Sequence, residues 1–323
     1  MTWSSIDFLS ESPPEHYTLA FEPFLYNQEA YLQLKEGRRY SFYMVDHTRQ
    51  QVLARIHFVL VSDATGSQRA VSLPESPFGS VEFGISVASS TLSDFMMYVI
   101  DELKMLSVNA IEIRDCIDAY RPSSNGLLEY VFHSLGFRKQ EVLTNHHIPV
   151  DQEQFSDKIH AMERRRIRKC KQAGFVARQE TLSNIQYFYS FILGCRQERG
   201  WGLSMSADEI QRTVAHFPAS YKIFAVYDQQ TCIAASLVVQ VNGTILYNFF
   251  PAMLLSYRPY SPMVMLLAEI YHYCYAQQIK LLDLGTSSQE SLRLFKVHVS
   301  GISSEKNTLV LDCLSNKTVS YLA

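Results

Sequence analysis

Three features are missing from this sequence of 323 residues: closely spaced cysteines, a long apolar run and a strong net charge. The six cysteines form no Cys-x-x-Cys pair and have no histidine at metal-ligand spacing, which argues against a zinc site or a disulfide framework. We expect reduced, mostly buried thiols and no bound metal. No apolar run approaches the roughly 20 residues that a membrane span needs, and the amino terminus lacks the basic start and apolar centre of a signal peptide. These absences predict a cytoplasmic protein without a membrane span.

The net charge of -3 provides no global attraction to nucleic acid, so binding of that kind would need a local basic patch. Apolar residues make up 47% of the chain and charged residues 19%, with no low-complexity tract, which is typical of a compact globular protein. The length is sufficient for two domains that each have a core.

One segment occurs twice, and the two copies differ at a residue that could carry chemistry. Gly126–Phe137 aligns without gaps on Ser291–Ile302, and a leucine, an aromatic residue, a histidine and a glycine recur. Positions shared by both copies are most simply explained by folding. Val131 of the first copy is replaced by Lys296 in the second, so Lys296 is the first candidate for a functional role.

Runs of β-branched and aromatic residues bounded by turn formers predict strands in the first half of the chain. The expected order is strands at Tyr40–Asp46, Val52–Ser62 and Arg69–Leu73, a helix near Leu92–Leu106, a strand at Ala110–Arg114, a helix from about Asn125 to Leu135, and a strand from Phe137 to Pro149.

The second half predicts the same order of elements. Its strands are Ile223–Tyr227, Ile233–Val241 and Ile245–Phe250, followed by a helix at Pro262–Gln277, a strand at Leu281–Leu284, a helix at Glu290–Val299 and a strand at Thr308–Leu314. Two further helices, about Asn184–Arg199 and Ala207–His216, precede these strands. They either cover an acceptor cleft or cover the sheet for stability.

Connections between the strands predict a mixed sheet. Asn242-Gly243 lies between two apolar runs and indicates a two-residue hairpin with a type I′ turn. A strand, a helix and a second strand indicate parallel pairing at that point. Ligands usually lie beyond the carboxyl ends of parallel strands, which places Phe250-Pro251 and Asp283-Leu-Gly285 at the mouth of a site.

Several short motifs in this order are similar to those of the FemABX-like family of tandem GNAT-fold acyl and aminoacyl transferases. They are Ser76-Pro-Phe-Gly79, the basic helix Arg164-Arg-Arg-Ile-Arg-Lys-Cys-Lys171 ending in Ala-Gly-Phe175, Leu282-Asp-Leu-Gly285, and Leu294-Phe-Lys296. The resemblance implies an α+β (α/β) fold of two tandem GNAT-like domains, each a mixed twisted sheet flanked by helices. It places the first domain at residues 1–150, completed by a last strand at about 305–323, and the second, with the active cleft, at 151–304.

The resemblance implies transfer of an acyl or aminoacyl group to an amine, with a peptidoglycan-precursor peptide or a small molecule as acceptor. The family needs no cofactor, and either acyl-CoA or aminoacyl-tRNA serves as donor. Because the chain lacks the long heptad hairpin that some relatives use to contact tRNA, the sequence favours the tRNA donor less. An acyl-CoA-dependent N-acyltransferase of a small molecule and a catalytically silent GNAT-like binding module are the alternatives. The sequence is compatible with a monomer or a homodimer.

Three residues are candidates for the chemistry of transfer. Acyl transfer to an amine needs a deprotonated nucleophile and a hydrogen-bond donor aimed at the oxygen that becomes negative. The resemblance assigns transfer to the Phe295-Lys296 pair; alternatively, Lys296 is a surface lysine on a helix. Asp283 is interpreted either as an acceptor for the amine, or its base through water, or as a cap for the following loop.

A donor site is expected at the start of the helix Pro262–Gln277. Ser261 is predicted to be its N-cap residue, the free amides of the first turn attract phosphate, and Arg258 lies just ahead. CoA-binding GNAT domains have two glycines here that this chain lacks, and a plain capped helix is the alternative. Tyr247 and Asn248 belong to the strand that flanks the expected cleft, where packing is their other interpretation.

The basic helix is the candidate anion site. Ile159, Met162, Ile167 and Cys170 recur at helical spacing and predict its buried face. Six like charges between Arg164 and Lys171 repel one another, so an anionic partner is favourable. The resemblance implies that arginines near here hold the diphosphate of the acceptor, and we assign this role to Arg165 and Arg168; a solvated face is the alternative.

Overall fold

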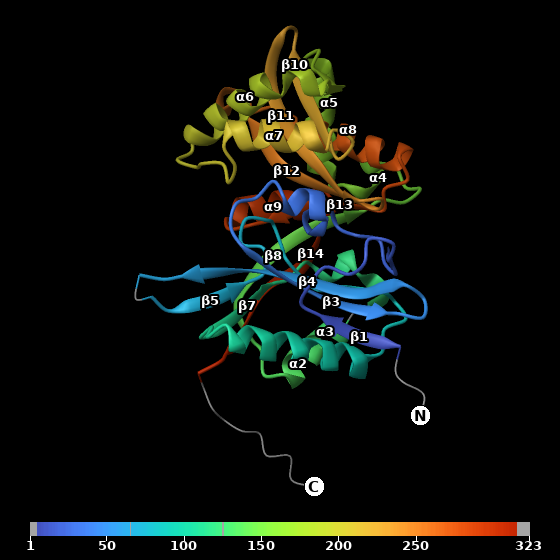
Figure 1. Ribbon diagram of the computed structural model, residues 1–323. Helices are drawn as coiled ribbons and strands as arrows, with labels where there is room; N and C mark the ends of the chain where they lie inside the picture. The colour runs from blue at the N-terminus through green and yellow to red at the C-terminus, as the bar shows by residue number, and fades with distance from the viewer. Residues whose placement is uncertain (1–4, 65, 125, 315–323) are drawn as a thin grey trace. The chain divides into compact units, whose positions relative to one another are not determined.

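The computed structural model describes residues 5–64, 66–124 and 126–314. The chain divides into two compact units: unit 1 comprises Met1–Leu143 and Glu305–Ala323, and unit 2 comprises Thr144–Ser304. Figure 1 shows the elements of each unit. Residues 1–4 and 315–323 of the expected first domain and Asn125, the expected helix start, lie outside the described residues.

Unit 1 is a mixed sheet with helices packed against it. In chain order its elements are β1 (Ile6–Leu9), β2 (Thr18–Leu19), η1 (Leu25–Asn27), α1 (Glu29–Leu32), β3 (Arg39–Asp46), β4 (Gln51–Ser62), β5 (Gln68–Val71), β6 (Glu82–Phe83), α2 (Ser89–Met105), β7 (Ala110–Arg114), η2 (Asp118–Tyr120), η3 (Pro122–Ser124), α3 (Leu127–Ser134), the first half of β8 (Arg138–Pro149) and most of β14 (Ile302–Asp312). The main strand order is β1-β3-β4-β5-β7-β14, and β5 and β7 pair in parallel.

The core of unit 1 forms because α2 has an apolar face at helical spacing. Leu92, Phe95, Met96 and Val99 recur at positions i, i+3, i+4 and i+7 and are fully buried. They belong to one cluster with alternating residues of β3 and β4, among them Phe42. The helix therefore covers one face of the sheet.

Unit 2 has a second mixed sheet. Its elements are the end of β8, α4 (Phe155–Lys158), α5 (Ala161–Gln172), β9 (Val176–Glu180), η4 (Leu182–Asn184), α6 (Ile185–Gln197), α7 (Ala207–His216), β10 (Tyr221–Asp228), β11 (Thr231–Asn242), β12 (Ile245–Met253), η5 (Leu255–Tyr257), α8 (Pro262–Ala276), β13 (Leu281–Thr286) and α9 (Glu290–His298). The strand order is β8-β13-β12-β11-β10-β9, and β12 and β13 pair in parallel.

Two helices cover the sheet of unit 2. Helix α8 contacts all five strands from β9 to β13, and its buried residues share a core cluster with Phe224 and Leu246. Helix α6 contacts β11 and β12, but none of its buried residues belongs to that cluster. Because successive strand residues face opposite sides, α6 covers the face opposite α8.

The structure confirms the predicted mixed α/β sheets and the expected elements, with shifts of a few residues at their ends. The hairpin between β11 and β12 also forms. Its two-residue loop is Gly243–Thr244 rather than Asn242-Gly243, because Asn242 pairs with Ile245 as part of the ladder. The predicted type I′ turn at Asn242-Gly243 is wrong, since the Asn242 carboxamide instead accepts bonds from the backbone and the hydroxyl of Thr244.

The caps of α3 and α9 shift the alignment of the two repeated segments by one residue. In α3 the amide of Phe137 donates to the carbonyl of Phe132, and Gly136 has a φ of 85°. In α9 the amide of Gly301 donates to the carbonyl of Lys296, and the residue with positive φ is Ser300. The capping pattern therefore pairs Lys296 with Phe132 rather than Val131, and either partner is a buried apolar residue.

Candidate functional site

Strands β12 and β13 begin as a parallel pair and then separate. The paired residues are Ile245 with Leu281, Leu246 with Leu282, and Tyr247 with Asp283. Beyond this point β12 continues to Met253 alongside β11 only, and β13 continues alongside β8. The separation leaves the backbone edges of both strands exposed to other groups at their carboxyl ends.

A bulge in β12 lies where the separation begins. Leu237 of β11 pairs with Phe250, and the next residue, Val238, pairs with Asn248, so Phe249 is the extra residue. Bulges bend and twist a strand. The bulge is therefore the local cause that turns β12 away from β13.

Lys296 lies at this point and is buried, with 6% of the residue exposed. Its ammonium donates to the carbonyl oxygen of Gly285 at 2.8 Å and to that of Thr286 at 2.7 Å. Both acceptors are at the carboxyl end of β13. Helix α9 thus places a cation against the strand end that β12 has left.

The charge of Lys296 is held under two opposing influences. Burial lowers the pKa of its ammonium to about 8, and the Asp283 carboxylate partly opposes this shift. Asp283 is itself buried, and its Oδ1 accepts bonds from the Asn145 side chain and from the amide of Gly285, each at 2.7 Å. The carboxylate thereby supports the ammonium and fixes the turn of the backbone at Gly285.

Tyr247 completes the cluster from the neighbouring strand. Gly285 has a φ of 74°, and a Cβ atom there would lie 3.3 Å from Cε2 of the Tyr247 ring. Burial and the nearby Asp283 raise the pKa of the Tyr247 hydroxyl, so it stays protonated. Glycine is needed at position 285 both for its backbone angle and for the approach of this ring.

His146 is a buried residue of the cluster, contributed by β8. Its Nδ1 lies 3.3 Å from the Ser287 hydroxyl, and its Nε2 has no hydrogen-bond partner among the described residues. Burial and the charges of Lys296 and Arg293 lower the pKa of the imidazole. His147 also has a partner, the Ser304 hydroxyl at 3.1 Å. The sequence gives no partner for this histidine pair, because both serines are distant in the chain.

The other candidates on α9 and β12 have structural contacts. Phe295 is half-buried and packs against the core around α8. Asn248 is buried, and its Oδ1 accepts a 2.6 Å bond from the Ser236 hydroxyl on β11. Both residues flank the point of separation. Their assignment to transfer and donor binding stays a prediction.

The start of α8 is built as expected, except for its cap. Ser261 is the N-cap residue and Pro262 opens the helix, but the Ser261 side chain makes no capping bond. Ser261 instead adopts a φ of 55°, a conformation that glycine adopts more easily. Arg258 is exposed in the preceding loop. The donor role of both residues stays a prediction.

Helix α5 has a different buried face from the predicted one. Met162 is exposed, and Glu163 is fully buried in its place. Glu163 is retained there because its Oε1 accepts a 2.5 Å bond from Arg166, and a buried carboxylate needs such a partner. Arg165 and Arg168 are exposed, so their role in binding an anion stays a prediction.

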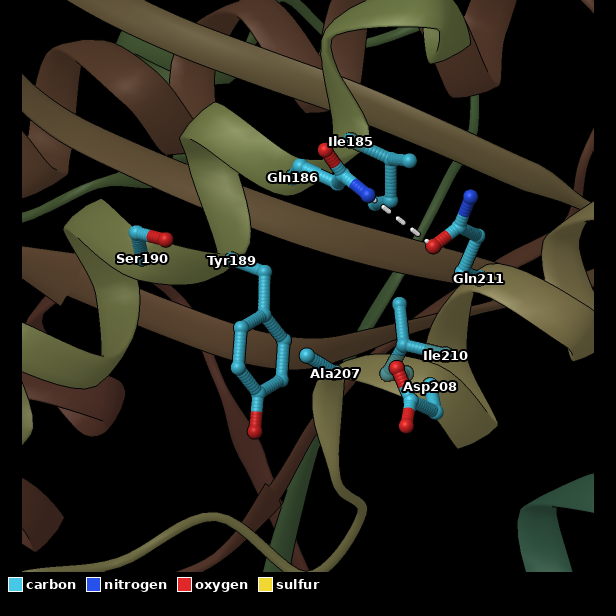
Figure 2. A pocket seen from close by; sticks show the side chains of 8 residues that line it. All are labelled: Ile185, Gln186, Tyr189, Ser190, Ala207, Asp208, Ile210 and Gln211. Atoms are coloured by element: carbon cyan, nitrogen blue, oxygen red, sulfur yellow. Dashed lines mark hydrogen bonds between the residues drawn. The ribbon is translucent and has the colours of Figure 1, made fainter.

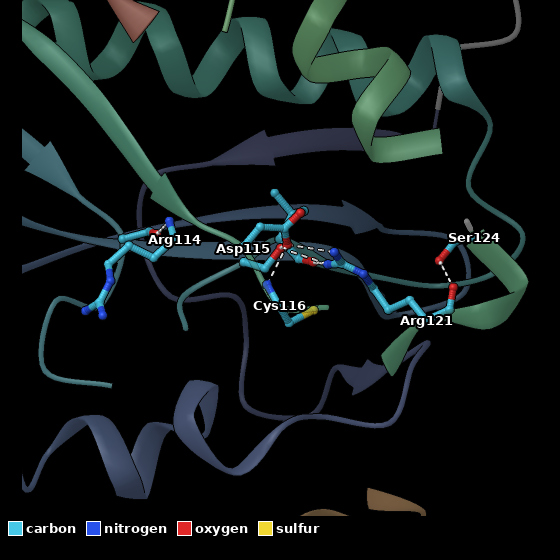
Figure 3. Close-up of polar contacts among 8 residues, drawn as sticks. Arg114, Asp115, Cys116, Arg121 and Ser124 are labelled. Carbon is cyan, nitrogen blue, oxygen red and sulfur yellow. Dashed lines mark hydrogen bonds and ion pairs between the residues drawn. The ribbon is translucent and has the colours of Figure 1, made fainter. Parts of the chain in front are cut away.

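The corresponding parallel pair in unit 1 is closed by its own chain (Figure 3). After β5, the amide of Ser72 donates to Glu112 and the amide of Gly79 donates to the carbonyl of Arg114. A Cβ atom on Gly79 would lie 2.5 Å from the Ser72 oxygen. Chain thus fills the space next to β7, where unit 2 has separated strands.

The side chains after β7 are also bonded to one another in Figure 3. Asp115 accepts bonds from the backbone amide of Cys116 at 2.8 Å and from Arg121 at 2.7 Å, and it also contacts Ser80. The Arg114 guanidinium donates to the carbonyl of Pro74. This network has the character of a structural support, so the candidate site is assigned to unit 2.

Unit 2 also has a cavity of about 200 Å³ between α6 and α7 (Figure 2). Its polar side chains bond to the protein: Gln186 donates to Gln211 at 3.0 Å, and the Tyr189 hydroxyl donates to the carbonyl of Met205 at 2.9 Å. The lining contains no buried charge. The cavity therefore lacks the chemistry present at the ends of β12 and β13.

Comparisons with known proteins agree with this geometry. Residues 158–292 match the family model described as an acetyltransferase (GNAT) domain. No curated protein sequence matches the chain. Similar solved structures include FemX, with a TM-score of 0.65, 12% identity and coverage of 90% of this chain and 93% of that chain.

Two further structures share the fold. L-PGS from Bacillus licheniformis has a TM-score of 0.58 and 14% identity, covering 94% of this chain and 96% of that chain. A tandem GNAT protein from the clavulanic acid biosynthesis pathway, without AcCoA, has a TM-score of 0.52 and 8% identity, covering 85% and 83%. The expected likeness to FemABX-like tandem GNAT proteins is confirmed at the level of the fold.

We predict that Asp283→Asn lowers the pKa of Lys296 further below about 8, because Asp283 opposes the effect of burial on the ammonium. NMR of reductively methylated lysines, with the Lys296 signal assigned by Lys296→Met, measures this pKa. Asp208→Asn, at an exposed position of α7, is the matched control and should leave it unchanged. An unchanged pKa in Asp283→Asn would show that the carboxylate does not act on Lys296.

A second prediction concerns the strained cap of α8. Ser261→Gly should stabilise the protein by about 0.5–1 kcal/mol, because glycine adopts a positive φ without a steric cost. Thermal unfolding should shift upward by about 1–3 °C. Ser256→Gly, in η5 of the same loop, should give no increase. Equal shifts in both variants would contradict the assignment of strain to Ser261.

Proposed function

We propose that unit 2 transfers an acyl or aminoacyl group to an amine acceptor and forms an amide bond. The observation that carries the proposal is the buried Lys296 ammonium at the separated ends of β12 and β13. The match of residues 158–292 to the GNAT acetyltransferase domain supports it. The exposed backbone edges provide room for an extended donor between the two strands.

Lys296 supplies the hydrogen-bond donor that acyl transfer needs. An ammonium group has three N–H donors, and the carbonyls of Gly285 and Thr286 take two of them. These two bonds fix the position of Nζ, and the third N–H donates to the carbonyl oxygen of the acyl group. That bond strengthens as the oxygen becomes negative in the tetrahedral intermediate.

The low pKa of Lys296 is consistent with a donor that gives up little of its charge to solvent. Lowering the pKa from 10.5 to about 8 corresponds to roughly 3 kcal/mol of differential interaction with the charged form. A site selected for stability alone would contain an apolar side chain, as the first copy of the segment does. Asp283 offsets part of this cost and acts as a positioning residue.

The remaining groups are assigned to the two substrates. The phosphate-bearing part of the donor, acyl-CoA or aminoacyl-tRNA, lies at the start of α8 near Arg258 and Ser261, with Tyr247 and Asn248 along its acyl end. The amine acceptor is a small molecule or a peptidoglycan-precursor peptide. Arg165 and Arg168 contact the anionic part of such a precursor.

Lys296→Met tests the proposal. With the donor and acceptor identified from a panel of acyl-CoA and aminoacyl-tRNA donors and amines, kcat should fall by about 10²–10³-fold, the typical cost of removing one such donor. Lys280→Met, at an exposed position of the same unit, should retain wild-type kcat. Wild-type kcat in Lys296→Met, or no turnover with any pair, would exclude the proposed role.

The pH dependence of kcat distinguishes a donor from a base. A donor must be protonated, so kcat should fall as pH rises through about 8, the pKa of Lys296. Lys296→Arg, which keeps its charge, should retain some activity and lack this falling limb. A rise of kcat through pH 8 in the wild type would assign Lys296 as a base instead.

The stability of the same variants has its own pH dependence. The pKa of Lys296 is lower in the folded state than the ordinary value of 10.5, so the unfolded state binds more protons between about pH 8 and 10.5. Wild-type stability therefore gains a contribution as pH rises through this window. Lys296→Met should lack that contribution in denaturant unfolding, and an identical pH profile would contradict the burial of a charged ammonium.

A further inference from the structure

Unit 1 contains a second group of buried polar atoms that the proposed function does not use. Four atoms form no hydrogen bond among the described residues: Nδ2 and Oδ1 of Asn27, one terminal nitrogen (NH2) of Arg55 and Nε2 of His57. The three residues are 1%, 7% and 2% exposed. Asn27 ends η1, while Arg55 and His57 lie two residues apart on β4 and so share one face of the sheet.

The three residues surround the same place, because each contacts a common set of neighbours. Nε of Arg55 donates to Glu82 on β6 at 2.6 Å, and the amide of Phe24, in the segment that carries Asn27, donates to the other carboxylate oxygen at 2.5 Å. Asn27 lies near enough to Glu82 to oppose the rise that burial causes in the pKa of that carboxyl. Its backbone acts in the same way on His57.

Burying so many unpaired polar atoms is costly. Each buried donor or acceptor without a partner costs about 1–3 kcal/mol, and native proteins leave few of them. Four in one place indicate a guest that carries the complementary donors and acceptors.

The charges of the site define the chemistry of that guest. Arg55 and Glu82 form an ion pair and neutralise one another. Burial, together with the charges of Arg55 and Arg39, lowers the pKa of His57 to about 3, so the imidazole is neutral at ordinary pH. An uncharged guest is therefore favoured, since a charged one would be buried without a counter-ion.

The donors and acceptors define it further. Asn27 offers an N–H beside a carbonyl oxygen, and Arg55 offers one more N–H. Nδ1 of His57 lies 2.8 Å from the Ser41 hydroxyl; when it donates there, Nε2 is an acceptor. The site then presents two donors and two acceptors, which are the complement of a primary carboxamide. Its oxygen accepts two bonds, and its NH2 group donates two.

We propose that unit 1 binds a small uncharged primary carboxamide between β4 and the segment Phe24–Leu32. The segment covers the site with η1 and the single turn of α1, held by ring contacts such as Phe24 with Phe78 at 5.3 Å and Tyr26 with Phe78 at 5.4 Å. Such short elements have few internal hydrogen bonds, so the segment opens to admit the guest. Every residue involved lies in Met1–Leu143, so the site is independent of Lys296.

Propionamide is the probe that tests this site in the full chain. It should raise the midpoint of thermal unfolding in a saturable manner. Propionate, its charged isostere, and 2-butanone, which lacks the N–H donors, should not. In the wild type, propionamide should also slow amide hydrogen exchange several-fold across residues 24–32. No upward shift, or equal shifts with all three compounds, would overturn the proposal and leave buried water as the guest.

Two variants complete the experiment. Asn27→Leu removes two of the four unpaired atoms at similar volume and should abolish both effects of propionamide. Asn184→Leu makes the same change at an exposed position of unit 2 and should retain both. A propionamide effect that persists in Asn27→Leu would overturn the site. If that variant does not fold, the exchange measurement on the wild type decides the question by itself.

Discussion

The separation of β12 from β13 is the constraint on which the rest of unit 2 depends. Once the parallel ladder ends at Tyr247 and Asp283, the carbonyls at the end of β13 have lost a neighbouring strand and need another donor. Lys296 meets that need from α9. The same separation creates the space in which a substrate can lie, so the structural and the proposed chemical role of Lys296 have one origin.

The ammonium stays charged in this setting because the surroundings are matched to it. Two carbonyl oxygens and the Asp283 carboxylate favour the charged form, while burial opposes it. Asp283 in turn is held by Asn145 and by the amide of Gly285. The glycine permits both the turn of the backbone and the approach of Tyr247. Each group is therefore constrained by a neighbour from a different element.

Unit 1 illustrates how the same arrangement of strands can be put to another use. Its parallel pair is followed by chain that bonds to the end of β7, and its polar residues there bond to one another. Its unpaired polar atoms lie elsewhere, on the face of β4 beneath the segment that carries Asn27. The two units thus share a sheet architecture but offer different chemistry, one cationic and one neutral.

The sequence by itself determined the elements and the mixed sheets, because β-branched runs and turn residues are local signals. It also identified Lys296 and Asp283, since the first stands out between the two segments and the second belongs to a recognisable motif. Its errors were of two kinds. Periodicity assigned Met162 to the buried face of α5, where an ion pair allows Glu163 instead, and gap-free alignment missed the one-residue shift between the caps of α3 and α9.

Only the tertiary structure decided which groups meet at the site. Asn145 and His146 lie more than a hundred residues before Asp283 and Ser287, and only the pairing of β8 with β13 joins them. The lowered pKa of Lys296 likewise follows from burial by residues distant in the chain. Local propensity is encoded in neighbouring residues, whereas burial and electrostatic environment depend on long-range packing. For this reason the sequence indicated the candidates, and the fold determined their chemical state.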